Sequence, residues 1–142
     1  MKNYIQRYLH DWLAFNRIYE QLATRNDLSF AELSVLLALE DHNYCATNRQ
    51  LVQDTGLSKQ TISSLVQKMV RNDLMSLTLN PNDKRSKLVR LTTRGQEWAN
   101  QILGDVHRFE TKTMSSLGAA TTRQLNGLNE ELLKRMEEEV QK

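Results

Sequence analysis

Two neighbouring segments of the chain carry side chains suited to binding a polyanion. The first, residues 57–72, is rich in Lys, Gln and Ser and contains no carboxylate. The second, residues 80–87, contains Lys84, Arg85 and Lys87. Gln and Lys can bond base edges in the major groove, and cationic side chains can contact phosphate or enter the minor groove. These residue types in adjacent segments indicate binding to a nucleic-acid duplex.

The distribution of charge supports this interpretation. The net charge of the 142 residues is only +2, but residues 49–95 carry nine Lys or Arg and three acids. The flanking residues 1–48 and 96–142 each have a net charge of −2. Clustered basic charge is typical of nucleic-acid-binding regions. From charge alone, an ordinary solvated basic surface is the alternative.

A helix-turn-helix would position the first segment. Gly56 suits the tight turn between two helices, and Ser58 is a good N-cap for the second helix. Apolar residues from Ile62 to Val70 recur at the spacing of one buried helix face. We predict base contacts from Gln60, Ser63, Ser64 and Gln67. We predict phosphate or minor-groove contacts from Ser58, Lys59, Lys68, Arg71, Lys84, Arg85 and Lys87.

A hairpin would position the second segment. Met75, Leu77 and Leu79 alternate with polar residues, which is the pattern of a strand. A second, less regular run contains Val89 and Leu91. The eight residues 80–87 are too many for a two-residue turn, so we expect a protruding loop, or wing.

The remaining chain is predicted to be helical. Residues 4–23 have a broad apolar face, with aromatic residues spaced by three or four. Residues 96–142 contain two further amphipathic stretches separated near Gly118. Four capping boxes are expected to open helices: Ser29 with Glu32, Thr47 with Gln50, Thr93 with Gln96, and Thr121 with Gln124.

The order helix-turn-helix, strand, basic loop, strand is that of a winged helix, and the chain resembles the MarR family of bacterial transcriptional regulators. The resemblance is carried by Gly56-Leu57-Ser58 and by the run Asp83-Lys84-Arg85 followed by Leu91-Thr92-Thr93-Arg94-Gly95. It extends over the whole chain. Asp73 replaces a glycine that the family usually has before the wing, and aspartate tolerates the left-handed conformation needed there.

The resemblance implies a homodimer built by the terminal helices, with two DNA-binding regions. It assigns Arg85 to the minor groove and gives Asp83 the role of holding the wing, by pairing with a nearby basic side chain. The fold class expected is mainly α with a small β-wing (α+β). The single domain 1–142 would contain a winged helix-turn-helix at 29–95 and dimerisation helices at 1–28 and 96–142.

The function expected is sequence-specific binding of double-stranded operator DNA by a ligand-responsive repressor, acting as a homodimer on a pseudo-palindrome. The alternative is a protein-interaction, oxidant-sensing or small-molecule-sensing module with weak or no DNA binding. No phosphate loop, nucleophile elbow or Ser/His/Asp order occurs, so no enzymatic activity is expected.

Other candidate sites are weaker. Cys45 is expected to be a structural thiol in a short strand beside the wing, and the three scattered histidines predict neither metal nor cofactor. His10, Trp12 and Phe15 could line a pocket for a small aromatic effector, although a plain dimer core explains them more simply. A single cysteine and the lack of a membrane-spanning stretch suggest a cytoplasmic protein.

Overall fold

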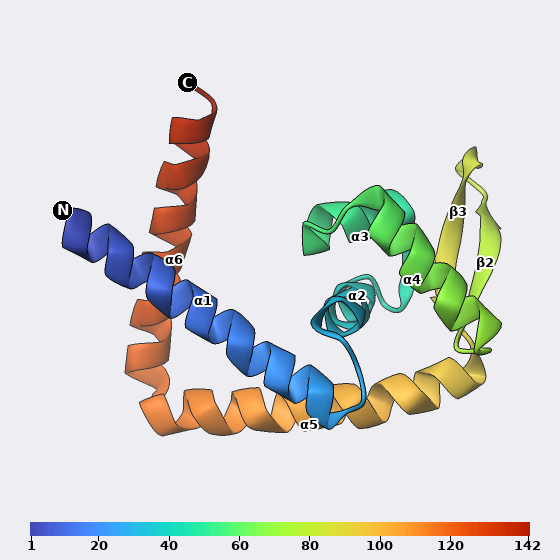
Figure 1. Cartoon of the computed structure of the whole chain (residues 1–142), viewed down its shortest axis with the longest axis horizontal. Coiled ribbons are helices and arrows are strands. Elements are labelled where there is room, and N and C mark those ends of the chain that lie inside the picture. The colour runs from blue at the N-terminus through green and yellow to red at the C-terminus, as the bar shows by residue number, and fades with distance from the viewer. The chain divides into compact units, whose positions relative to one another are not determined.

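The computed structural model describes all residues from Met1 to Lys142 (Figure 1). Six helices and three short strands follow one another along the chain. Their bounds are α1 Lys2–Arg25, α2 Phe30–Asp41, β1 Cys45–Thr47, α3 Asn48–Thr55, α4 Lys59–Arg71, β2 Met75–Asn80, β3 Asp83–Leu91, α5 Thr93–Leu117 and α6 Ala119–Val140. The mainly helical fold with a small β-wing is thus confirmed. The chain forms two compact units, Met1–Leu103 and Gly104–Lys142.

Side-chain caps set the start of several helices. The capping boxes of Ser29 with Glu32 and of Thr47 with Gln50 are both present, and Ser58 caps α4 by accepting from the Thr61 N–H. The box predicted at Thr93 is wrong by one residue, because the Thr92 hydroxyl accepts from the Gly95 N–H at 2.9 Å.

The capping box predicted at Thr121 is wrong. The α6 helix begins at Ala119 with Gly118 as its N-cap, so Thr121 lies inside the first turn. Gly118 lies between α5 and α6 with φ +83°, a conformation that glycine adopts without strain.

The core of the first unit gathers apolar side chains from each of its helices and from the sheet. Leu33, Leu36, Leu39, Leu51 and Ile62 are fully buried. The α4 helix buries Ile62, Val66 and Met69, as its apolar spacing predicts. The face of α4 opposite these three residues is consequently left to polar and cationic side chains.

The three strands form an antiparallel sheet in the order β1-β3-β2. Cys45 pairs with Arg90 and Thr47 with Leu88, which confirms the predicted short strand beside the wing. The eight-residue loop predicted at 80–87 is wrong in detail, because β2 and β3 extend through it and Asn80 pairs with Asp83. The pairing register shifts between Leu79 and Asn80, so the wing tip is an irregular hairpin.

Backbone geometry at two turns fits the local sequence. Gly56 ends α3 with φ +69° and Asp73 follows α4 with φ +58°, both left-handed as predicted. After the hairpin, α5 passes so close to Leu74 that a Cβ on Gly95 would lie 1.8 Å from the Leu74 carbonyl oxygen. Only glycine fits at this position.

The second unit contains the end of α5 and all of α6. No residue of α6 is buried within the chain. Its large apolar residues instead remain exposed, among them Leu125, Leu128, Leu133, Met136 and Val140. None of the helices has an apolar stretch of the length needed to cross a membrane.

Candidate nucleic-acid interface

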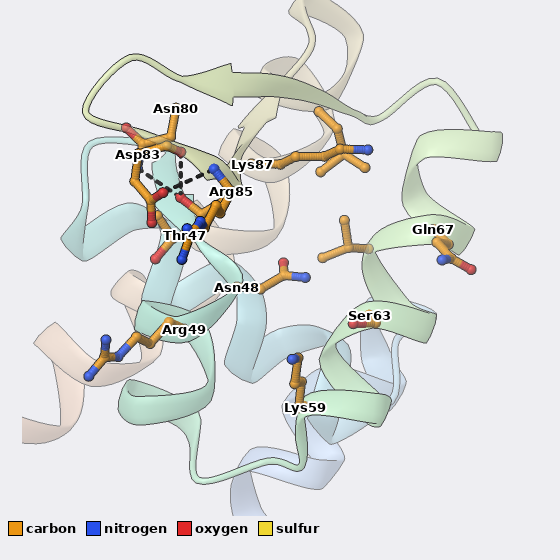
Figure 2. Close-up of a pocket in the computed structure, with 13 residues that line it drawn as sticks. Thr47, Asn48, Arg49, Lys59, Ser63, Gln67, Asn80, Asp83, Arg85 and Lys87 are labelled. Carbon is orange, nitrogen blue, oxygen red and sulfur yellow. Dashed lines mark hydrogen bonds between the residues drawn. The ribbon is translucent and has the colours of Figure 1, made fainter.

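A groove of about 560 Å³ lies between the start of α3, the outward face of α4 and the wing. Figure 2 shows Asn48 pointing from α3 toward α4, whereas Arg49 points outward, with Lys59, Ser63 and Gln67 on α4 and Arg85 and Lys87 on the wing. Segments that are distant in sequence therefore present polar side chains to one space.

The groove is strongly cationic. Arg49, Lys59, Arg85 and Lys87 line it, and none of them has an ion-pair partner. The single acid is Asp83, whose Oδ1 accepts from the Arg85 backbone N–H at 3.0 Å. Four uncompensated cations around one groove create a positive potential that suits a phosphate backbone.

Short-range hydrogen bonds shape the wing tip. The Asn80 side chain accepts from the Asn82 N–H and donates to Ser86 Oγ, each at 3.0 Å. Asp83 was expected to pair with a basic side chain, but its observed partner is the Arg85 backbone. The Arg85 guanidinium consequently stays exposed and free for an external anion.

The predicted contact residues of α4 divide into groups. Lys59, Ser63 and Gln67 line the groove, whereas Gln60 and Ser64 lie outside it on exposed positions of the same helix. The Ser58 hydroxyl is used as the helix cap.

Two predicted cations do not line the groove. Lys84 is exposed in the wing. Arg71 lies around a separate shallow depression with Asp73, Arg94 and Trp98.

Lys68 has an intramolecular partner. Its Nζ lies 2.5 Å from Glu32 Oε1, and Glu32 is the only charged residue buried in the chain, with 6% of its surface exposed. Burial would raise the pKa of Glu32, but the hydrogen bonds from Lys68 and Ser29, together with the Lys68 charge, lower it below the ordinary 4.5. The pair ties the start of α2 to the last turn of α4.

Two groove residues at the start of α3 are polar or charged and were not predicted from the sequence. Arg49 is exposed at the second position of α3, and the preceding Asn48 has a buried Oδ1 with no hydrogen-bond partner. The sequence did contain a signal for both residues, namely the capping box of Thr47 with Gln50. That box places Asn48 and Arg49 in the first turn of a helix, where the backbone N–H groups have no partner within the helix.

The predicted effector residues do not form one site. Trp12 lines a groove with residues of α2 and α3, but His10 and Phe15 do not line it. His10 lies 3.5 Å from Asp11, and 61% of the Phe15 surface is exposed. Cys45 is a half-buried free thiol.

Sequence comparison places residues 26–86 within the sequence model of the MarR family. The chain is 26% identical over 102 residues to the HTH-type transcriptional repressor NicR of Pseudomonas putida (strain KT2440), an alignment that covers 72% of the chain and just 64% of NicR. It is 27% identical over 110 residues to the multiple antibiotic resistance protein MarR of Escherichia coli K12, covering 75% of the chain and 76% of that protein.

Structural comparison extends the match to the entire chain. The MarR family regulator NMB1585 from Neisseria meningitidis superposes with a TM-score of 0.82 at 22% identity, covering 99% of this chain and 98% of that one. A cysteine-to-serine mutant of E. coli MarR, solved with operator DNA, gives a TM-score of 0.72 at 23% identity, over 91% of this chain and 93% of the other. The sequence model, the curated relatives and the solved structures agree, and all of them support a relationship of this chain to the MarR family of transcriptional regulators.

Proposed function

We propose that the protein is a repressor that binds double-stranded operator DNA as a homodimer and is released by a small ligand. The observation that carries the proposal is the groove between α3, α4 and the wing, with four cations that have no acidic partner. A merely solvated surface would mix charges of both signs, whereas a surface facing phosphates avoids carboxylates.

Within this proposal, α4 is the recognition helix. Gln60, Ser63, Ser64 and Gln67 contact base edges, because they present donors and acceptors on the polar face of the helix. Arg85 reaches the minor groove, and the other exposed cations contact phosphates: Lys59, Arg71, Lys84, Lys87 and the newly identified Arg49. Lys68 contributes by positioning α4 through Glu32, since its ammonium group is already engaged.

A homodimer would cover the apolar surface that the single chain leaves open. The first half of α1 exposes Tyr4, Ile5, Leu9 and Leu13, each with half or more of its surface accessible. The α6 helix exposes a comparable set in the second unit. Exposed apolar surface of this kind marks an interaction site. A dimer would also place two recognition helices on a pseudo-palindrome, about one helical turn apart.

Ligand response is part of the proposal because the operator affinity of a dimer depends on the spacing of its recognition helices. A ligand that binds one dimer geometry better than another shifts the population toward it. The named relatives NicR and MarR are a repressor and a resistance protein, which suits such regulation.

Selection of genomic fragments tests the central claim. The purified protein should enrich a small set of fragments sharing an inverted repeat, and the affinity for them should fall steeply as salt concentration rises. Sedimentation should show a dimer. Recovery of random fragments only, with a flat salt response, would favour the alternative of a protein-interaction or oxidant-sensing module.

A further inference from the structure

A second groove in the first unit has the opposite charge to the cationic groove between α3, α4 and the wing. It has a volume of about 470 Å³ and lies between α1, α2 and the last turn of α3. Three aromatic residues line it: Trp12 and Tyr19 from α1, and Phe30 from α2. Leu37 and Ala38 extend its apolar wall.

Carboxylates supply the only formal charge in the lining. Asp41 comes from the end of α2 and Asp54 from the end of α3, and no Lys or Arg lines the groove. The Asp41 carboxylate is exposed and has neither an ion-pair nor a hydrogen-bond partner. Asp54 Oδ2 lies 2.6 Å from His42 Nε2, so one of the two acids retains a fully uncompensated charge.

We propose that this groove binds an organic cation, such as an alkylated ammonium compound with an aromatic or aliphatic body. Aromatic faces attract cations through the ring quadrupole, and quaternary ammonium groups are recognised by several aromatic side chains together. The carboxylates complement the charge of such a ligand, and the apolar wall accommodates its hydrocarbon part. An anionic ligand would face Asp41 without any compensating cation.

The position of the groove gives a bound cation direct contact with the helix-turn-helix. Asp54 and Thr55 are the last two residues of α3 and immediately precede Gly56, whose φ of +69° makes the turn toward α4. Thr55 also supports that turn, because its Oγ1 accepts from the Leu57 N–H at 3.2 Å. The binding site itself does not depend on the proposed DNA-binding function.

Trp12 provides a direct readout of binding. In a Trp98→Phe background, which leaves Trp12 as the only tryptophan, benzyltrimethylammonium chloride should change the emission saturably, at constant ionic strength. Benzyl alcohol, similar in body but uncharged, should bind at least about five-fold more weakly, the factor expected for one partly exposed charge interaction. Calorimetry should give one cation per protomer.

Charge removal on the protein gives the matched test. Asp41→Asn should weaken binding of benzyltrimethylammonium by about five-fold. Asp27→Asn, the same chemical change at a position outside the groove, should leave it unchanged. Absence of saturable binding, equal affinity for benzyl alcohol, or full affinity in Asp41→Asn would each overturn the proposal, whether or not the protein binds DNA.

Discussion

Lys59 and Lys68 lie near opposite ends of the same helix, α4, but their surroundings differ. Lys59 faces the open groove and has no acidic partner. Lys68 is 2.5 Å from the buried carboxylate of Glu32, a residue 36 positions away in the sequence. One lysine is therefore available to an external anion, whereas the other holds the helix against α2. The cations of this helix face are therefore not equivalent, and the position of the nearest acid determines which of them are available to an external anion.

Removing the groove cations should have the largest effect. The combined variant Lys59→Met, Arg85→Ala, Lys87→Met should weaken operator binding on the order of 100-fold for each protomer, since each lost phosphate or minor-groove contact contributes roughly 1 kcal/mol. Fluorescence anisotropy at fixed salt measures this change. Urea unfolding should show unaltered stability, and a variant that binds normally would remove the groove from the DNA interface.

The buried pair should matter for folding. Lys68→Met leaves the Glu32 carboxylate buried without its cation, so we expect a loss of about 2 kcal/mol in the free energy of unfolding. Lys59→Met, the same substitution at the open end of α4, should change stability by less than about 0.5 kcal/mol. Equal effects in urea titrations would mean that the two lysines do not differ as described.

Acid should weaken the same pair. The pKa of Glu32 is lower in the folded chain than its ordinary 4.5, so the unfolded chain binds this proton more readily. The stabilisation is complete well above pH 4.5 and is lost as the pH falls through the folded pKa. In urea titrations between neutral and strongly acidic pH, wild type should therefore lose more stability than Glu32→Gln, which has no carboxylate to protonate. Parallel pH profiles of the two proteins would contradict this expectation.

The smallest expected effect is a difference between Lys59 and Lys68 in the salt dependence of operator binding. Lys59→Met should lower the slope of log K against log salt by about 0.9 for each protomer, because one phosphate contact is lost. Lys68→Met, measured under conditions where it stays folded, should keep the wild-type slope. A reduced slope for Lys68→Met would show that its ammonium leaves Glu32 to contact the backbone.

Features that depend on local sequence were predicted well. The buried face of α4 follows from the spacing of Ile62, Val66 and Met69, and the left-handed turns follow from Gly56 and Asp73. Each depends on residues close to one another in the chain. The polar face of α4 was correct for the same reason, because burying one side of a helix leaves the other exposed.

Features that depend on distant partners were missed. Nothing near Lys68 in the sequence indicates that Glu32 will lie against it, and the importance of Arg49 becomes visible only when α3 meets the wing. The wing was predicted as a long loop because its pairing continues through polar residues, where alternation of apolar side chains gives no signal. At α5, Thr92 rather than Thr93 is the cap, and its hydroxyl also donates to the carbonyl of Asp73 at 2.7 Å, a residue 19 positions away.

Thr47 belongs to two structures at once, since it is the last residue of β1 and the N-cap of α3. Its pairing with Leu88 joins the base of the wing directly to the first helix of the helix-turn-helix. Grafting the hairpin of a relative onto this chain by itself would change the strand partner of this shared residue, and with it the start of α3. A chimaera should transplant residues 45–91 as one cassette.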